Sequence, residues 1–237
     1  LSGMPLKSLT RNSPKTPDKY VTAKLKAIIH FKKRKGNSAV PTGIVKLRER
    51  KSLLGSGNWI ITLGRFDIAF SYSMAPRYGH LDALKQVFGY LRRMPDGRIL
   101  INTSQPPVRK TAIVTKRQNW VEFYPDACED VPHDMLEPKG GLTTLTCYVD
   151  ADHARDKLTR RSVTGIVLLL NNTPIVWLSK RQKTVETSTY GSELIASRIA
   201  VDLVLSMRYK LRMLGLTLEH SSMMVGDNMS VVLNTTI

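Results

Sequence analysis

The sequence predicts an α/β protein whose C-terminal part is a mixed sheet packed by helices. Apolar runs separated by turn residues between positions 143 and 180 predict three consecutive strands. A long helical periodicity follows, and then one more short strand and the start of another helix. Ahead of this part, apolar residues at helical spacing predict a mostly helical segment.

The composition limits the class of protein. The 237 residues are 42% hydrophobic, which is enough for a buried core, and no apolar run is long enough for a membrane helix. We therefore expect no membrane partner. The two cysteines, Cys128 and Cys147, stand in no metal-ligand spacing, which favours a reducing intracellular setting. Cys147 lies in an apolar run and is expected to be a buried strand residue.

The positive charge is concentrated at the start of the chain. Residues 1–50 hold thirteen lysines and arginines against Asp18 and Glu49, so they carry +11 of the net charge of +17. Such a segment attracts polyanions, of which nucleic acid is the most common. The alternative is a solvated, partly disordered tail.

The first 140 residues divide into two parts. Residues 1–50 are predicted to be a basic, flexible segment with one short helix at 21–35. In residues 51–140, helices are predicted to pack closely around Trp59. A helix is predicted at 79–94 and a short strand at 98–104. Prolines then predict an irregular connector that ends near residues 135–142, so the third part is residues 141–237. Trp59 and Trp120 are expected to be packing residues.

The third part begins with a strand at 143–150 and a polar loop. Two strands, 163–171 and 175–180, form a hairpin through the turn Asn-Asn-Thr-Pro. A long helix follows, and Gly215 ends it. Its apolar stripe consists of Ile195, Ile199, Leu203, Met207 and Leu211. A strand at 222–227 and a helix from residue 228 complete the order.

Three carboxylates stand at comparable places in this pattern. Asp150 ends the first strand, Glu193 lies near the start of the long helix, and Asp227 ends the last strand. Strand ends at one edge of an α/β sheet converge, and three carboxylates there would bind a divalent cation, most naturally Mg²⁺. Taken singly, each acid has a structural alternative: a turn residue at Asp150, a helix-dipole acid at Glu193, and a helix cap at Asp227-Asn228.

The combination resembles a known family. The stretches YVDADHARD, RRSVTGIVLLLNNTPIVWLSKRQKTVETSTYGSELIAS and GDNMSVVLN are similar, in this order, to the ribonuclease H domain of copia-type retrotransposon Pol polyproteins. The stretch NWIITLGRFDIAFSYSMAPRYGHLDALKQVFGYLRRMPDGRILI resembles the segment that connects the reverse transcriptase to that domain. The resemblance covers about residues 51–237. It implies a ribonuclease H-like mixed sheet with flanking helices.

The resemblance also implies an activity. Asp150, Glu193 and Asp227 match the family's catalytic, metal-binding acids, which hold two Mg²⁺ ions about 4 Å apart, with Mn²⁺ as a substitute. The substrate would be an RNA–DNA hybrid, recognised by shape and 2′-OH groups. Trp177 is expected to be a core residue. Basic residues near the strands could contact the phosphates of the hybrid or could simply be surface residues: Arg160, Arg161, Lys180, Arg181 and Lys183.

The chain departs from the family pattern in several places. His153 replaces a tryptophan and Gly191 replaces a glutamate, and neither position is a metal ligand in the family. The family's fourth carboxylate and a nearby histidine fall after Ile237, and the polymerase motif Y-x-D-D is absent. We therefore expect a C-terminally truncated domain. The alternative function is an inactive, decayed retroelement fragment that at most binds nucleic acid through its basic segment.

A retroelement origin implies partners and a location. The partners would be the RNA–DNA hybrid and the polymerase portion of the same polyprotein. The location would be a cytoplasmic particle or the nucleus.

Overall fold

The computed structural model describes residues 42–73, 81–106, 122, 125–126, 133–156, 159–218 and 221–235. The predicted helix at 21–35, Trp120 and most of the basic segment lie outside these residues. The chain divides between Arg98 and Ile99 into two compact units, ahead of the predicted boundary at 140/141.

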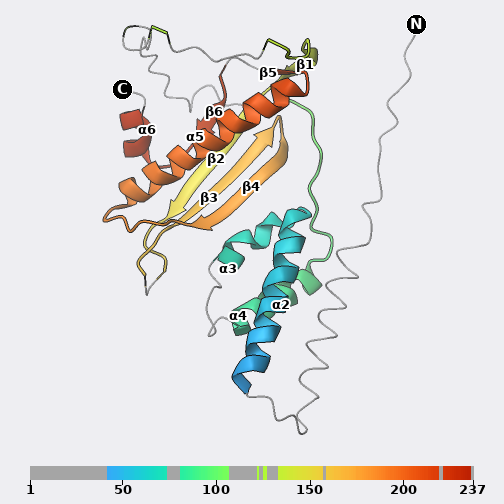
Figure 1. Ribbon diagram of the computed structural model, residues 1–237, viewed down its shortest axis with the longest axis vertical. Coiled ribbons are helices and arrows are strands. Elements are labelled where there is room, and N and C mark those ends of the chain that lie inside the picture. Colours follow the sequence, from blue (N-terminus) through green and yellow to red (C-terminus); the bar gives the residue numbers. More distant parts are fainter. Residues whose placement is uncertain are drawn as a thin grey trace, which may run out of the picture. The chain divides into compact units, whose positions relative to one another are not determined.

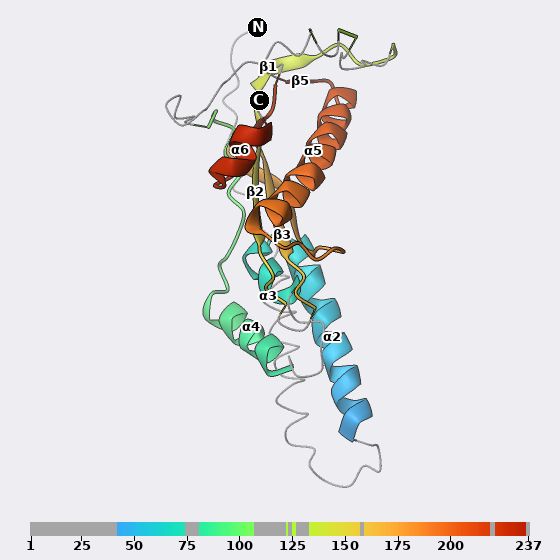
Figure 2. The same cartoon turned by 90° about the vertical axis from the view of Figure 1, so that its left-hand side faces the viewer.

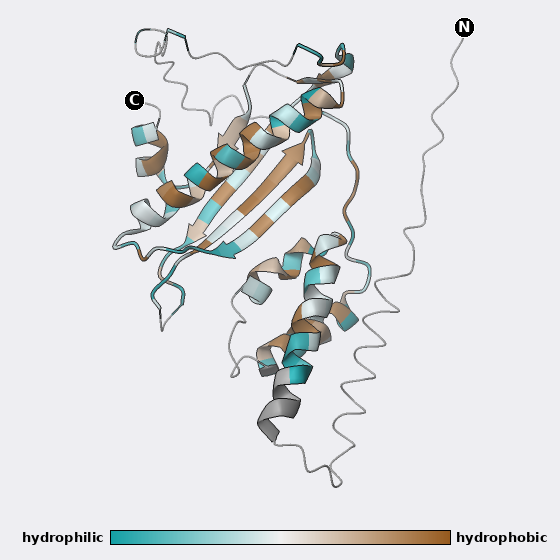
Figure 3. Cartoon of the chain, viewed as in Figure 1, coloured by the Kyte–Doolittle hydropathy of each residue, from teal (hydrophilic) through white to brown (hydrophobic). Residues whose placement is uncertain are grey.

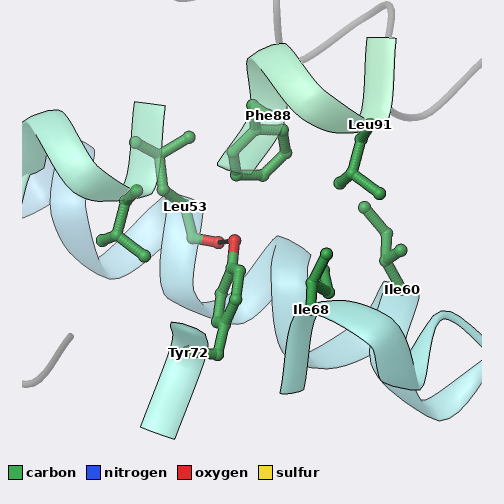
Figure 4. Packing of buried hydrophobic residues seen from close by; sticks show 7 residues of the cluster. Leu53, Ile60, Ile68, Tyr72, Phe88 and Leu91 are labelled. Carbon is green, nitrogen blue, oxygen red and sulfur yellow. Dashed lines mark hydrogen bonds between the residues drawn. The ribbon is translucent and has the colours of Figure 1, made fainter. Parts of the chain in front are cut away.

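Helices alone form the described part of the first unit: α2 (Thr42–Thr62), the 3₁₀ helix η1 (Phe66–Ile68), α3 (Ala69–Ser73) and α4 (Leu81–Arg93). Because α2 begins at Thr42, residues 42–50 are helical, and the prediction of a flexible segment up to residue 50 is wrong there. Apolar side chains from these helices form one core: Leu53, Ile60, Ile68, Tyr72, Leu84, Phe88 and Leu91. In Figure 4 the Tyr72 hydroxyl points at the Leu53 carbonyl, to which it donates at 3.1 Å.

Two local predictions for this part of the chain are wrong. Trp59 is 56% exposed, because the face of α2 that packs against the core carries Leu53, Gly57 and Ile60 instead. Residues 98–104, all of which the structure describes, form no strand. The backbone of Asn102 instead pairs with the hydroxyl of Thr173, which donates to Asn102 O at 3.0 Å and accepts from Asn102 N at 2.8 Å.

The second unit is built on a mixed sheet (Figure 1). Within the described residues its strands run in the order β4 (Thr173–Arg181), β3 (Val163–Leu170), β2 (Leu145–Asp152) and β6 (Met223–Val225). β3 is antiparallel to both β2 and β4, whereas β2 and β6 are parallel. The predicted hairpin and the mixed α/β class are confirmed, and the predicted strands and helices β2, β3, β4, α5, β6 and α6 occur in the predicted order, with two further strands among them. Trp177 is half-buried on β4.

Two short strands were not predicted. β1 (Lys139–Thr143) and β5 (Leu216–Leu218) form a parallel pair of their own. β1 has the sequence KGGLT and is largely exposed. This sequence has neither the alternation of apolar and polar residues nor the apolar run by which a strand is predicted. Such a strand is recognised only once its partner is known.

Helix α5 (Thr189–Met213) crosses one face of the sheet (Figure 2). The Ser188 side chain caps its first turn by accepting from Gly191 N, and Gly215 follows its end with φ +75°, a conformation that favours glycine. The residues most deeply buried lie one position after most of the predicted stripe: Ala196, Ala200, Val204, Arg208 and Leu211. Ala196 and Ala200 are both fully buried.

The core of this unit lies between α5 and the sheet. Leu145 and Cys147 of β2 and Ile166 and Leu168 of β3 are buried against Ala200 and Val204. In Figure 3 hydrophobic residues gather on the central strands. Helix α6 (Met229–Thr235) lies beside the start of α5. No helix among the described residues is long and apolar enough to cross a membrane.

Candidate functional site

Asp150 and Asp227 lie near the same end of the parallel strands β2 and β6, but neither ends its strand as predicted. Asp150 lies within β2, which continues to Asp152, and Asp227 lies two residues after the last residue of β6. The β2–β6 register pairs Thr146 with Met223 and Tyr148 with Val225. Gly226, the next residue after β6, lies against Val149. Asp150 and Asp227 are each two residues past the last pair of this register, Tyr148 and Val225. Both aspartates therefore lie toward the same end of the β2–β6 pair.

The side chain of Asp150 is on the sheet face away from α5. Cys147 is buried against α5, whereas Tyr148 is 48% exposed and Asp150 is exposed, as the alternation of a strand requires. Asp150 Oδ1 accepts from the Ala151 N–H at 2.7 Å. Asp227 is also exposed.

Glu193 is held near the sheet by its neighbour in α5. The buried side chain of Gln182, just after β4, donates from Nε2 to Ser192 O at 2.7 Å and to Thr164 Oγ1 at 3.0 Å. Thr164 pairs with Ala151, the residue after Asp150. Gln182 thereby fixes the start of α5, and with it Glu193, over the end of β2.

Glu193 also contacts the residue that follows Asp227. Asn228 Nδ2 donates to Glu193 Oε1 at 3.0 Å, while Asn228 Oδ1 accepts from Ser230 N at 3.0 Å and Val231 N at 3.2 Å. The second pair of bonds is a helix N-cap, so the structural alternative for Asp227-Asn228 is confirmed for Asn228. Glu193 lies beyond the first turn of α5 and is half-buried.

The carboxylates do not form a metal-ligand set in this arrangement. Among the described residues no group of three or more His, Cys, Asp or Glu side chains is placed to hold a metal ion. One oxygen of Glu193 accepts from Asn228, and one oxygen of Asp150 accepts from its own strand. The donors are of the type that Mg²⁺ prefers, but their present positions do not fit a bound ion.

Basic residues occupy the same end of the sheet. The register aligns Lys180 with Thr164 and Ala151, and Arg181 with Val163 and Asp152. Lys180 therefore lies two strands from β2, about 10 Å away across the sheet. The five basic residues predicted to contact phosphates are exposed or half-buried at this end: Arg160, Arg161, Lys180, Arg181 and Lys183. Arg155, in the loop after β2, is exposed there as well. They would present positive charge beside Asp150.

The loop between β2 and β3 is closed by Asp156. Its carboxylate accepts from Thr159 Oγ1 at 2.7 Å and from Arg181 Nη1 at 2.8 Å. Its backbone N–H donates to Arg161 O, and its carbonyl accepts from Arg160 N. Arg160 adopts a left-handed φ of +56°, which these bonds hold in place. Arg181 is thus already paired with an acid within the chain.

Sequence reasoning missed the roles of Asp156 and Gln182 and of the Asn228 amide toward Glu193. Asp156 and Gln182 are buried polar residues, 7% and 4% exposed, and each lies close to a predicted strand. Arg181 lies 25 residues from Asp156, and Gln182 contacts Thr164 and Ser192, which lie 18 and 10 residues away, so spacing alone does not reveal these contacts. A buried polar residue has to be hydrogen-bonded, which would identify both once burial was known.

Comparison with known proteins gives one partial similarity. No family model and no solved structure matches the chain. A 58-residue stretch is 40% identical to secreted RxLR effector protein 161 of Plasmopara viticola. The stretch covers 24% of this chain and 41% of that protein. Since the chain spans only about two-fifths of that relative's length, the match identifies no family.

Proposed function

We propose that the chain is a fragment of a copia-type Pol polyprotein with ribonuclease H-type activity, the divalent-metal-dependent hydrolysis of RNA in RNA–DNA hybrids. The observation that supports this proposal is that Asp150 and Asp227 lie toward the same end of the parallel β2–β6 pair, and that Glu193 accepts a hydrogen bond from Asn228, the residue after Asp227. The motif resemblance assigns these same three residues. The mixed sheet packed by α5 is compatible with the fold that the family implies.

The charges at this end of the sheet suit a nucleic-acid substrate. Arg160, Lys180 and Lys183 are exposed and would attract the phosphates of the hybrid. The three acids would have to draw closer than they lie here to hold Mg²⁺ or Mn²⁺. The ion, when bound, supplies the charge that activates water and stabilises the leaving 3′-oxygen of the RNA. The polymerase portion of the polyprotein is a further proposed partner, and a cytoplasmic particle or the nucleus is the proposed location.

A second candidate function is nucleic-acid binding without cleavage. It is favoured by the absence, among the described residues, of a three-ligand group for a metal. The basic segment at 1–50 and the basic side chains beside β4 would both contribute to such binding. This candidate corresponds to a decayed retroelement copy.

The test is cleavage of an end-labelled RNA–DNA hybrid by the purified chain in Mg²⁺ and in Mn²⁺, with Asp150→Asn as the matched variant. Cleavage that is lost in Asp150→Asn supports the ribonuclease. If the wild-type chain is folded by circular dichroism and binds the hybrid without cutting it, the second candidate is correct. Equal cleavage by both proteins would show that a contaminating nuclease is responsible, and the activity would be rejected.

A further inference from the structure

Trp59, on helix α2, is the most exposed aromatic side chain among the described residues of the first unit, at 56%. Tryptophan side chains are highly buried on average, so an exposed one needs a reason. The core of this unit is filled by other residues of the same helix, Leu53 and Ile60. Packing among the described residues therefore does not account for Trp59.

The surface of α2 around Trp59 is open and positively charged. Three exposed residues precede Trp59 on the same side of the helix, four, eight and eleven positions earlier: Gly55, Lys51 and Arg48. Together with Trp59 they form what we call the Trp59 face. No described atom lies within 4 Å of the point where a Cβ atom would stand at Gly55, so the surface one turn from Trp59 is free of side chains. At a rise of 1.5 Å per residue, Lys51 and Arg48 follow about 12 and 17 Å along the axis.

The net positive charge of the chain lies almost entirely in this unit. Residues 1–98 hold 20 lysines and arginines against five aspartates and glutamates, so they carry +15 of the net charge of +17, whereas the second unit carries +2. A polyanion is therefore attracted to the first unit much more strongly than to the second. Single-stranded nucleic acid combines such a polyanion with planar, unpaired bases, which stack on exposed aromatic side chains.

We propose that the Trp59 face binds single-stranded nucleic acid, with an unpaired base stacked on Trp59 and nearby phosphates in contact with Lys51 and Arg48. Every base has a planar face that can stack, so the site accepts RNA and DNA without a sequence preference. In a duplex the bases are already stacked on one another and are not offered to Trp59. The inference goes beyond the proposed function, because it requires neither a metal ion nor the predicted catalytic acids.

The test is fluorescence anisotropy of the full chain with labelled oligouridylate and oligothymidylate of equal length, in EDTA. Trp59→Ala should weaken the binding of both strands by about 10-fold or more, whereas Trp59→Phe, which keeps an aromatic ring, should retain most of the affinity. Tyr209→Ala is the matched control. It removes a similarly exposed aromatic side chain, at 52%, from the second unit, and it should bind both strands as the wild type does.

The salt dependence of binding separates stacking from charge. Each phosphate contact with a single strand contributes about 0.7 to the slope of log affinity against log salt. Lys51→Met should reduce that slope by about this amount, whereas Trp59→Ala should lower the affinity and leave the slope unchanged. If Lys51→Met does not change the slope, the strand does not follow the Trp59 face and the site is rejected.

Three further results would overturn the proposal. The first is that Trp59→Ala binds both single strands as tightly as the wild type does. The second is that Trp59→Ala weakens the binding of a duplex of the same length equally, since stacking on Trp59 requires unpaired bases. The third is that Trp59→Ala melts well below the wild type, which would show that Trp59 is packed within the fold. A failure of hybrid cleavage leaves the proposal standing, because binding is measured without metal.

Discussion

Arg181 Nη1 donates to Asp156 Oδ2 at 2.8 Å, and this ion pair joins the end of β4 to the loop between β2 and β3. The Asp156 side chain is 9% exposed and that of Arg181 is 31% exposed. A pair so placed is worth more than a fully exposed one, because losing one partner leaves a largely buried charge uncompensated. The pair therefore stabilises a loop that carries three further arginines, Arg155, Arg160 and Arg161.

Asp156→Ala is expected to lower the free energy of unfolding by about 1–3 kcal/mol, since it removes charge-assisted bonds from Arg181 and Thr159. Asp152→Ala is the control, because Asp152 forms only a 3.5 Å contact with exposed Arg155 and should cost little. Urea denaturation measures both. Equal losses in the two variants would show that the Asp156 bonds do not stabilise the loop.

The same ion pair predicts a difference between two neighbouring basic residues in nucleic-acid binding. Each phosphate neutralised by a basic side chain contributes about 0.9 to the slope of log affinity against log salt. Lys180→Met should reduce that slope by about this amount, whereas Arg181→Met should change it less, because Asp156 already offsets the Arg181 charge.

Fluorescence anisotropy with a labelled RNA–DNA hybrid over a range of salt concentrations gives both slopes. If Arg181→Met reduces the slope as much as Lys180→Met does, Arg181 leaves Asp156 for phosphate when the hybrid binds. If neither variant changes the slope, this end of the sheet does not contact the hybrid.

The regular elements of the second unit could be predicted from the sequence because their signals are local. The hairpin of β3 and β4 has apolar runs on either side of a turn, and α5 has helical periodicity ended by Gly215. β1 could not be predicted because it is largely exposed and has no apolar pattern, and β5 could not because it has only three residues. Residues 98–104 read as a strand, but their backbone hydrogen bonds go to side chains such as Thr173.

In the candidate site too, some features could be predicted from local sequence and others depend on packing between distant segments. Motif and strand position predict Asp150, Glu193 and Asp227 as site residues, and the two aspartates each lie two residues past the last pair of the β2–β6 register. Spacing does not specify how far the side chains converge, because Asp150 points from the sheet face away from α5. Contacts such as those of Gln182 and Asn228 depend on the packing of α5 and α6 against the sheet, which local sequence does not encode.

In the first unit, Gly57→Ala is expected to destabilise the core. A Cβ atom at Gly57 would overlap the ring of Tyr72, which is 6% exposed and whose hydroxyl donates to Leu53 O. Overpacking of this kind costs about 1–3 kcal/mol. Gly55→Ala is the matched control: it lies in the same helix with nothing near its Cβ position, and alanine there should stabilise α2.

Urea denaturation of both glycine variants checks this prediction. The double change Gly57→Ala with Tyr72→Ala should recover much of the packing loss relative to the sum of the single variants, since the clash is then removed. If Gly57→Ala is as stable as Gly55→Ala, α2 and α3 do not approach each other as the structure has them.

The lowered pKa of Asp67 leads us to expect that the first unit loses stability in acid. Burial alone would raise its pKa, but hydrogen bonds from Arg65 and Tyr90, with the charge of Arg65, lower the pKa below its ordinary value of 3.8. A carboxyl whose pKa is lowered by folding stabilises the folded state above its unfolded pKa, and this stabilisation is lost as the pH falls through the folded pKa. Wild-type stability should therefore decline between about pH 5 and pH 2, and Asp67→Asn should show a shallower decline.

Urea denaturation over this range, with exposed Asp82→Asn as the control, measures the difference. Identical pH dependence in the wild type and Asp67→Asn would show that Arg65 and Tyr90 do not hold the Asp67 carboxylate in solution.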